Sequence, residues 1–186
     1  MRGQLSRFEV ADDATSGDWL LQSGTISSDL ITFGPMVYPA YARLNYADAT
    51  LEDDAEAPTD ITLVREMAVV LGTFTTTPDD CYFCVWDGYA GSFLSDEFAG
   101  LRKRVQIPGR DYVLFTGPLS ALHEWENEFG RGGPAPAPAF MWPRDRRWCF
   151  TSDVDTEWAT IGAERAAVEK LITRSPRAEK FAPPTV

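Results

Sequence analysis

The sequence predicts a single α+β domain, built as a mostly antiparallel sheet with about three helices packed on it. An apolar run over residues 81–86, a hairpin signal around residues 108–110 and three segments with helical spacing predict this class. The length of 186 residues suits one domain, and 44% hydrophobic residues supply a sizeable core. Residues 34–182 form the predicted domain, and residues 1–33 are an N-terminal extension or hairpin of it.

The run from Cys81 to Tyr89 is the densest apolar and aromatic stretch of the chain, and it predicts a central strand. Alternate side chains of a strand point to opposite faces of the sheet. One face would carry Tyr82, Cys84 and Trp86, and the other Phe83 and Val85. Both faces are apolar, so we expect layers on both sides of this strand. Asp87-Gly88 then ends the strand with a turn.

The segments before this strand are expected to be short. Residues 7–10 and 18–22 predict a hairpin, and residues 30–33 predict a further strand. Residues 37–44 are aromatic-rich and predict an extended or helical segment on the core. Thr59 or Asp60 would cap a helix that runs to about Leu71, where Gly72 stops it.

A second hairpin follows the central strand. Residues 104–107 and 111–116 predict its two strands, and Pro108-Gly109-Arg110 is typical of the turn between them. Gly117-Pro118 would open a helix that ends at Gly130. Its buried stripe would consist of Leu119, Leu122, Trp125 and Phe129. Residues 130–139, rich in glycine and proline, predict a loop.

The last third of the chain predicts a strand, a turn and a helix. Residues 147–151 form the strand, apolar on both faces, and residues 153–158 form an acidic turn. Thr160 would cap a helix from about residue 162 to 173. The core face of this helix would be Ala167, Val168, Leu171 and Ile172.

The composition is acidic, with 28 acidic against 17 basic residues and a net charge of −11. This balance argues against sequence-independent nucleic-acid binding and suits either solubility or a basic protein partner. The acidic stretch 48–60 is either a solvated loop or a site for a basic surface. No apolar run is long enough for a bilayer, and the N-terminus lacks a signal-peptide core, so a cytoplasmic location is predicted.

Candidate chemistry is sparse. Cys81 and Cys84 form a Cys-x-x-Cys, but positions i and i+3 of a strand face opposite ways, which favours core packing over a metal or redox site. The three cysteines suggest no disulfide framework. His123 follows Ser120 on a predicted helix without a Gly-x-Ser-x-Gly elbow, which favours a surface histidine. No catalytic residue, metal or cofactor is predicted.

One group of aromatic and charged residues is a candidate binding site. It comprises Trp86, Asp87 and Tyr89 at one strand end, Trp142, Arg146 and Trp148 before another strand, and Asp153 and Asp155 in the acidic turn. If the two strands are neighbours, these residue types, which dominate binding hot spots, would meet at one sheet end. Alternatively Trp86 and Trp148 fill the core, Arg146 pairs with Asp87 at the sheet edge, and Asp153 and Asp155 shape a turn.

Several of these motifs resemble a family of actinobacterial proteins that has no established activity. The resemblance covers residues 34–182, and Trp86-Asp87-Gly88 and the segment from Trp142 to Cys149 carry it. The family's Gly-Gly-Ser before the last helix is Gly162-Ala163-Glu164 here, which weakens an anion site at that helix. The layout is also similar to immunity proteins of bacterial toxin systems, although only in architecture.

Two functions follow as predictions. The first is a non-enzymatic, immunity-like protein-binding module that meets a basic partner surface. The alternative is a small-molecule-binding protein or enzyme, whose pocket would be lined by Trp86, Tyr89, Trp142 and Trp148 with Asp87 and Arg146 as polar groups. A structural subunit of a homo-oligomer is a third possibility.

Overall fold

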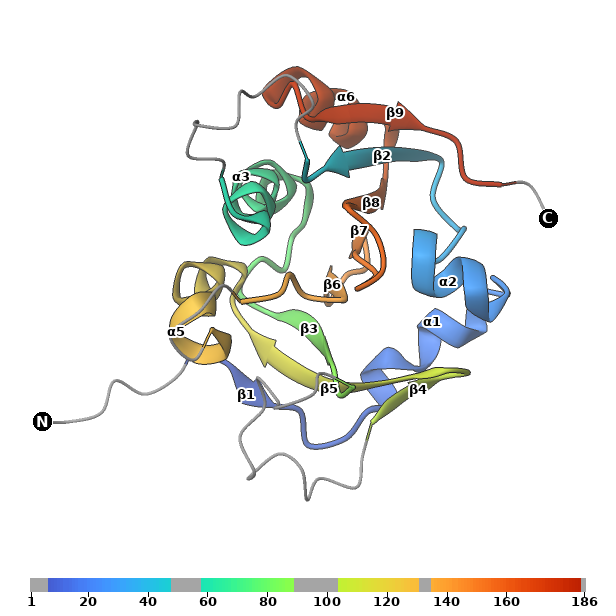
Figure 1. Ribbon diagram of the computed structural model, residues 1–186, viewed down its shortest axis with the longest axis vertical. Helices are drawn as coiled ribbons and strands as arrows, with labels where there is room; N and C mark the ends of the chain where they lie inside the picture. Colours follow the sequence, from blue (N-terminus) through green and yellow to red (C-terminus); the bar gives the residue numbers. More distant parts are fainter. Residues whose placement is uncertain (1–6, 48–57, 89–103, 131–134, 185–186) are drawn as a thin grey trace, which may run out of the picture.

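The computed structural model describes residues 7–47, 58–88, 104–130 and 135–184. Its centre is one antiparallel sheet in the order β1-β5-β3-β6-β7-β8-β2-β9, with β4 also paired to β5 (Figure 1). The strands are β1 (Glu9–Val10), β2 (Ala40–Asn45), β3 (Cys81–Trp86), β4 (Val105–Ile107), β5 (Arg110–Gly117), β6 (Phe140–Pro143), β7 (Trp148–Thr151), β8 (Trp158–Ala163) and β9 (Ala178–Phe181).

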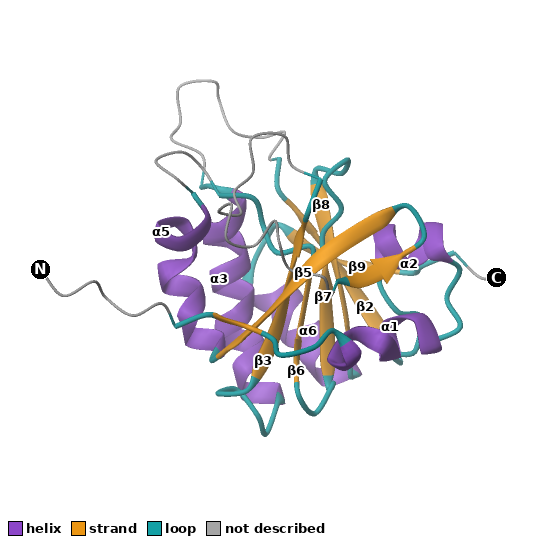
Figure 2. Cartoon of the chain, turned by 90° about the horizontal axis from the view of Figure 1, so that it is seen from below, coloured by secondary structure: helices purple, strands orange, loops and turns teal. Residues whose placement is uncertain are grey.

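Helices cover both faces of the sheet (Figure 2). They are α1 (Asp18–Gln22), α2 (Ser27–Phe33), α3 (Asp60–Leu71), α5 (Trp125–Phe129) and α6 (Arg165–Arg174), with 3-10 helices η1 (Thr15–Gly17), η2 (Gly72–Phe74) and η3 (Leu119–Glu124). The larger core lies under α3, η3, α5 and α6, and the smaller core lies under α1, α2 and β4. The antiparallel α+β class is confirmed, but the described residues form five α-helices where about three were expected.

Strand β3 is an inner strand, as predicted, and its two faces supply the two cores. Phe83 and Val85 are buried in the larger core, and Cys84 is buried in the smaller one. Tyr82 and Trp86 pack partly buried against the smaller core. The side chains of β3 therefore alternate between the two faces of the sheet as the sequence predicts.

The predicted hairpin is confirmed in β4 and β5. Ile107 pairs with Arg110, so that Pro108 and Gly109 make a two-residue turn. Gly109 has φ of 92°, a left-handed conformation that glycine adopts without a steric cost. Proline followed by such a glycine is typical of a type II turn.

The N-terminal prediction is wrong in two places. Residues 18–22 form α1 and not the second strand of a hairpin, and residues 30–33 belong to α2 and not to a strand. β1 pairs with β5 at the edge of the sheet instead. The helices have five and seven residues, too few for helical periodicity to stand out from a short apolar run. Residues 37–44, left open between extended and helical, lead into β2.

The segment after β5 is helical, as predicted, but it is divided into η3 and α5. Leu119, Leu122 and Trp125 are buried at intervals of three residues, which is the repeat of a 3-10 helix. The predicted buried stripe is therefore confirmed, although its first two turns are tighter than an α-helix. Helix α3 confirms its predicted bounds, from Asp60 to Leu71.

The end of the chain holds a strand that the sequence did not reveal. Thr160 was expected to cap the last helix, but it is fully buried in β8, and α6 begins only at Arg165. Glycine weakens the strand pattern of β8. A Cβ on Gly162 would lie 2.5 Å from Tyr38 Cδ2, so this glycine makes room for the Tyr38 ring. The local sequence around Gly162 does not predict this contact. Strands β6 and β9 were likewise not predicted.

Gly34, which ends α2, packs closely against β7, and a substitution there tests this contact. It has φ of 81°, and a Cβ there would lie 2.3 Å from Thr151 Oγ1 of β7. We expect Gly34→Ala to lower the free energy of unfolding by about 2 kcal/mol, from backbone strain and the clash together. Gly24 has φ of 77° with no atom within 4 Å, so Gly24→Ala should cost only about 1 kcal/mol. Urea denaturation measures both, and equal losses would contradict the contact with Thr151.

Candidate functional site

Three strand ends meet at one end of the sheet and bring together side chains from distant parts of the chain. β3 ends at Trp86, β5 begins at Arg110, and the loop between β7 and β8 carries Asp153 and Asp155. The Arg110 guanidinium carbon lies 4.9 Å from the centroid of the Trp86 ring. Arg110 Nη2 donates to Asp155 Oδ2 at 2.8 Å and to Asp153 Oδ1 at 3.5 Å. We call these four residues, with Asp87, Arg104 and Asp111, the Arg110 cluster.

The Arg110 cluster carries more negative than positive charge. Arg104 Nε donates to Asp87 Oδ2 at 2.9 Å. The cluster therefore has the carboxylates of four aspartates and the guanidinium groups of two arginines. The Asp155 side chain is 75% exposed and Asp111 is also exposed, whereas the Asp153 side chain is only 11% exposed. A cavity of about 320 Å³ opens here, lined by Trp86, Asp87, Gly88, Gly109, Arg110 and Asp111.

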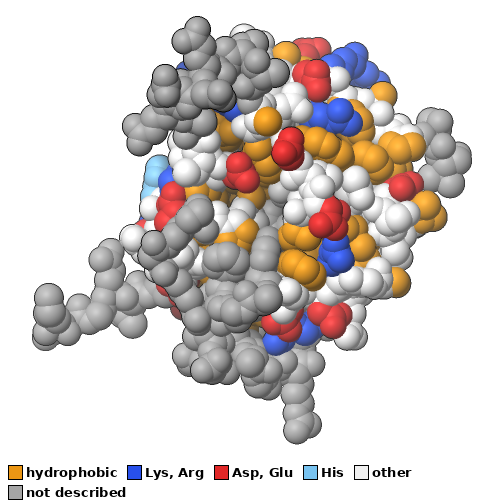
Figure 3. Space-filling view, in the orientation of Figure 1, with side chains coloured by type: hydrophobic (Ala, Val, Ile, Leu, Met, Phe, Trp, Pro, Cys, Tyr) orange, Lys and Arg blue, Asp and Glu red, His pale blue; other side chains and the backbone are white. Residues whose placement is uncertain are grey.

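The Arg110 cluster combines an aromatic ring with paired and exposed charges. Tryptophan and arginine are among the residue types that anchor protein interfaces. Acidic and basic side chains also lie beside hydrophobic surface on the face of the molecule shown in Figure 3.

The structure does not bring the other predicted site residues to this end. Strand β6 separates β3 from β7, so the expected side-by-side placement of β3 and β7 is wrong. Trp142 pairs in register with Tyr82, near the opposite end of β3 from Trp86. Trp142 and Trp148 are fully buried, and they point into the smaller and the larger core. They therefore line no shared pocket with Trp86. Tyr89 lies outside the described residues.

Arg146 also lies away from Asp87, so the expected ion pair between them does not form. Its backbone has φ of 55° in the turn between β6 and β7, and its guanidinium carbon lies 5.2 Å from the Trp19 ring centroid. Tyr38 Oη donates to the Arg146 carbonyl at 2.9 Å. Asp87 pairs with Arg104 instead.

Sequence reasoning missed Arg104 and Arg110 as members of the site. Part of the signal was present, because the hairpin prediction places Arg110 in the turn directly before the strand 111–116, and the structure puts it at the first position of β5. In an antiparallel sheet this position meets the last residues of a neighbouring strand. Only the pairing of β3 with β5, which sets Trp86 opposite Tyr112, identifies that neighbour.

The Cys-x-x-Cys is a pair of core residues, as predicted. Cys81 lies in the larger core and Cys84 in the smaller, on opposite faces of β3. Burial raises the pKa of the Cys81 thiol to about 12, and nearby Asp80 adds to this shift. Burial also raises the pKa of Cys149 to about 12. Both thiols are therefore protonated at neutral pH and lack the thiolate that reactivity needs.

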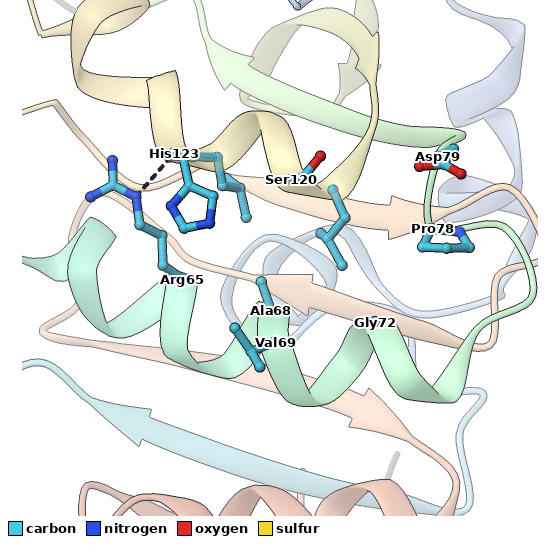
Figure 4. Close-up of a pocket in the computed structure, with 10 residues that line it drawn as sticks. Arg65, Ala68, Val69, Gly72, Pro78, Asp79, Ser120 and His123 are labelled. Carbon is cyan, nitrogen blue, oxygen red and sulfur yellow. Dashed lines mark hydrogen bonds between the residues drawn. The ribbon is translucent and has the colours of Figure 1, made fainter.

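A second cavity, of about 240 Å³, lies between α3 and η3 (Figure 4). His123 and Ser120 line it, but no hydrogen bond joins these two side chains among the described residues. Ser120 Oγ accepts from Arg7 Nη2 at 2.8 Å. Arg65 Nε donates to the Leu122 carbonyl, and its guanidinium pairs with Glu126. Arg65 and Ser120 are thus engaged with the protein itself.

Comparison with known proteins yields no relative. No protein-family model matches the chain, and no curated protein or solved structure matches it either.

Within the described ranges, no three histidine, cysteine or acidic side chains are grouped so that they could hold a metal ion. None of the helices described there has the length and apolar character needed to cross a membrane.

Proposed function

We propose that this protein is a non-enzymatic binding module that meets a basic protein surface through the Arg110 cluster. The observation that carries this proposal is Arg110 itself, which stacks on Trp86 and holds Asp153 and Asp155 beside it. A stacked arginine is already ordered before a partner arrives, so binding costs less side-chain entropy. An immunity-like role and a cytoplasmic location are part of the same proposal.

The charge of the Arg110 cluster determines the kind of partner. Arg104 pairs with Asp87, and Arg110 pairs with Asp153 and Asp155, so carboxylates outnumber cations. The side chains of Asp111 and Asp155 are the exposed ones. Lysine or arginine side chains of a partner would meet them, while the Trp86 ring supplies apolar area. The net charge of −11 would also speed the encounter with a basic protein, at a rate that falls with salt.

The acidic stretch 48–60 was the second predicted contact region. Residues 48–57 lie outside the described residues, and Asp60 opens α3. Whether that stretch contributes to binding stays a prediction, so the experiment below tests the Arg110 cluster alone.

The experiment captures partners from a lysate of the native cells on the immobilised full chain and quantifies them by mass spectrometry. The site variant carries Asp111→Lys and Asp155→Lys. We expect a basic protein to be enriched on the wild-type chain at 50 mM salt, and its capture to fall at least about fivefold on the site variant. The same protein should be lost from the wild-type chain at 500 mM salt, because the Debye length shortens from roughly 14 Å to 4 Å.

A matched variant separates the site from the overall charge. Glu66→Lys with Glu169→Lys changes the net charge by the same amount at exposed positions of α3 and α6. Retention of the partner by this control supports the Arg110 cluster as the binding surface. An equal loss on both variants, or no enriched basic protein at either salt concentration, overturns the proposal.

A further inference from the structure

A third cavity lies at the opposite end of the sheet from the Arg110 cluster, where β2 begins and β9 ends. Its volume is about 520 Å³, larger than the cavity at Arg110. Its walls come from Met36 and residues 38–41 on one side and residues 180–184 on the other, with Arg165 of α6. Tyr41 of β2 and Phe181 of β9 are paired in register, so that the two walls are joined by the sheet itself. We call this cavity the β2–β9 groove.

Hydrogen bonds within the protein hold the aromatic wall of the β2–β9 groove in place, so this wall is formed without a ligand. Tyr41 Oη donates to the Pro35 carbonyl at 3.1 Å and accepts from the Tyr38 backbone N–H at 3.0 Å. Tyr38 Oη in turn donates to the Arg146 carbonyl at 2.9 Å. The aromatic side of the groove is therefore ordered before binding, as in most small-molecule sites.

The charge of this groove is opposite to that of the protein. Arg165 and Lys180 line it, and no aspartate or glutamate does, in a chain whose net charge is −11. Both cationic side chains are exposed, and neither forms an ion pair with any residue in the described ranges. The remaining lining is mostly apolar, with Met36, Phe181 and Pro183 among its members.

From this combination we propose that the β2–β9 groove binds a small organic carboxylate with an apolar body. The carboxylate would lie at Arg165 and Lys180, and the apolar body would extend along the rest of the lining past the end of β9, where Ala182 and Pro183 lie. The cavity volume falls within the range of about 300–1,000 Å³ that is usual for small-molecule sites. Two unpaired cations beside apolar walls match an acid, whereas an amine or a neutral alcohol leaves those charges without a counter-ion. This inference does not depend on the Arg110 cluster.

The test compares three probes with the same eight-carbon chain, namely octanoate, octylamine and 1-octanol, by titration of the full-length protein. NMR of the backbone amides supplies both the affinity and the location. We expect octanoate to bind at least about tenfold more tightly than octylamine, with the largest shifts at residues 38–41 and 180–183. Equal affinity for the acid and the amine overturns the proposal, and so does no binding of octanoate.

Paired variants separate the groove from the general charge of the protein. We expect Arg165→Gln with Lys180→Gln to weaken octanoate binding about tenfold. Lys170→Gln with Arg174→Gln removes the same charge at exposed positions of α6 outside the groove and should leave binding unchanged.

Ala182→Trp, at an exposed lining position, should block the groove for octanoate and 1-octanol alike. Octanoate shifts centred on the cavity at His123, or an equal effect of both glutamine pairs, would refute the assignment.

Discussion

Replacing Trp125 with alanine is expected to lower the free energy of unfolding by about 3–5 kcal/mol. Trp125 is fully buried at the start of α5, and its ring lies 4.2 Å from Phe129 and 5.2 Å from Phe8, measured between centroids. It also contacts Phe83 of the central strand, at 5.9 Å. The substitution therefore leaves a cavity where α5, β3 and the N-terminal segment meet. Urea denaturation followed by circular dichroism measures the loss.

A conservative variant divides this effect into packing and hydrogen bonding. Trp125 Nε1 donates to the Pro136 carbonyl at 2.8 Å, which ties the segment after residue 134 to α5. Trp125→Phe keeps an aromatic ring but loses this bond, and we expect a cost of about 1–2 kcal/mol beyond any repacking. A loss below about 1.5 kcal/mol for Trp125→Ala would contradict the central place of this ring in the larger core.

Replacing Asp145 with alanine is expected to cost about 3 kcal/mol at pH 7, the second-largest effect. Its Oδ2 atom accepts from the Thr76 backbone N–H at 2.7 Å, from Thr75 Oγ1 at 2.8 Å and from Thr76 Oγ1 at 3.0 Å. Its Oδ1 atom accepts from the Arg147 backbone N–H at 3.2 Å. One carboxylate thus ties the segment before β3 to the turn between β6 and β7. Thermal and urea unfolding of the variant measure the cost.

The same carboxylate makes stability depend on pH. Burial alone would raise the pKa of Asp145, but the hydrogen bonds from Thr76, Thr75 and Arg147 together outweigh it and lower the pKa below its ordinary value of 3.8. A lowered pKa in the folded state adds stability above the pKa of the unfolded chain, and this stability is lost as pH falls through the folded value. The difference in unfolding free energy between wild type and Asp145→Ala should therefore shrink below about pH 4.

Arg147→Ala serves as the control for this prediction. The Arg147 side chain is 55% exposed, and its Nε atom lies 4.0 Å from Asp145 Oδ2. A surface pair of this kind contributes at most about 1 kcal/mol, so the variant should stay close to wild type. A difference between wild type and Asp145→Ala that is constant from pH 7 to pH 3 would show that the carboxylate charge is not what stabilises the turn.

Much of the local structure could be predicted because each element carries its own pattern. The alternation in β3, the Pro-Gly turn of the second hairpin and the apolar spacing of α3 are all local, and all three are confirmed. Short elements could not be predicted in this way. The five residues of α1 and the glycine-containing β8 have no pattern strong enough to outweigh the alternatives, and packing against distant residues decides them.

The candidate site shows the same division. Local residue types identified Trp86, Asp87, Asp153 and Asp155 as members of a possible site, and the structure gathers these four around Arg110. The same types at Trp142 and Trp148 pointed to the same site, yet these two rings fill the two cores. A tryptophan in a cavity and a tryptophan in a core look alike in a sequence.

The sequence by itself determined that this is an acidic antiparallel α+β protein with a central strand buried on both faces. It also determined that Cys81 and Cys84 must face opposite cores, because strand geometry allows nothing else. Only the tertiary structure decided that β6 lies between β3 and β7, and that β5 brings Arg110 to Trp86. Strand order depends on contacts between residues far apart in the chain, and the local pattern of any one strand does not record which neighbour it will meet.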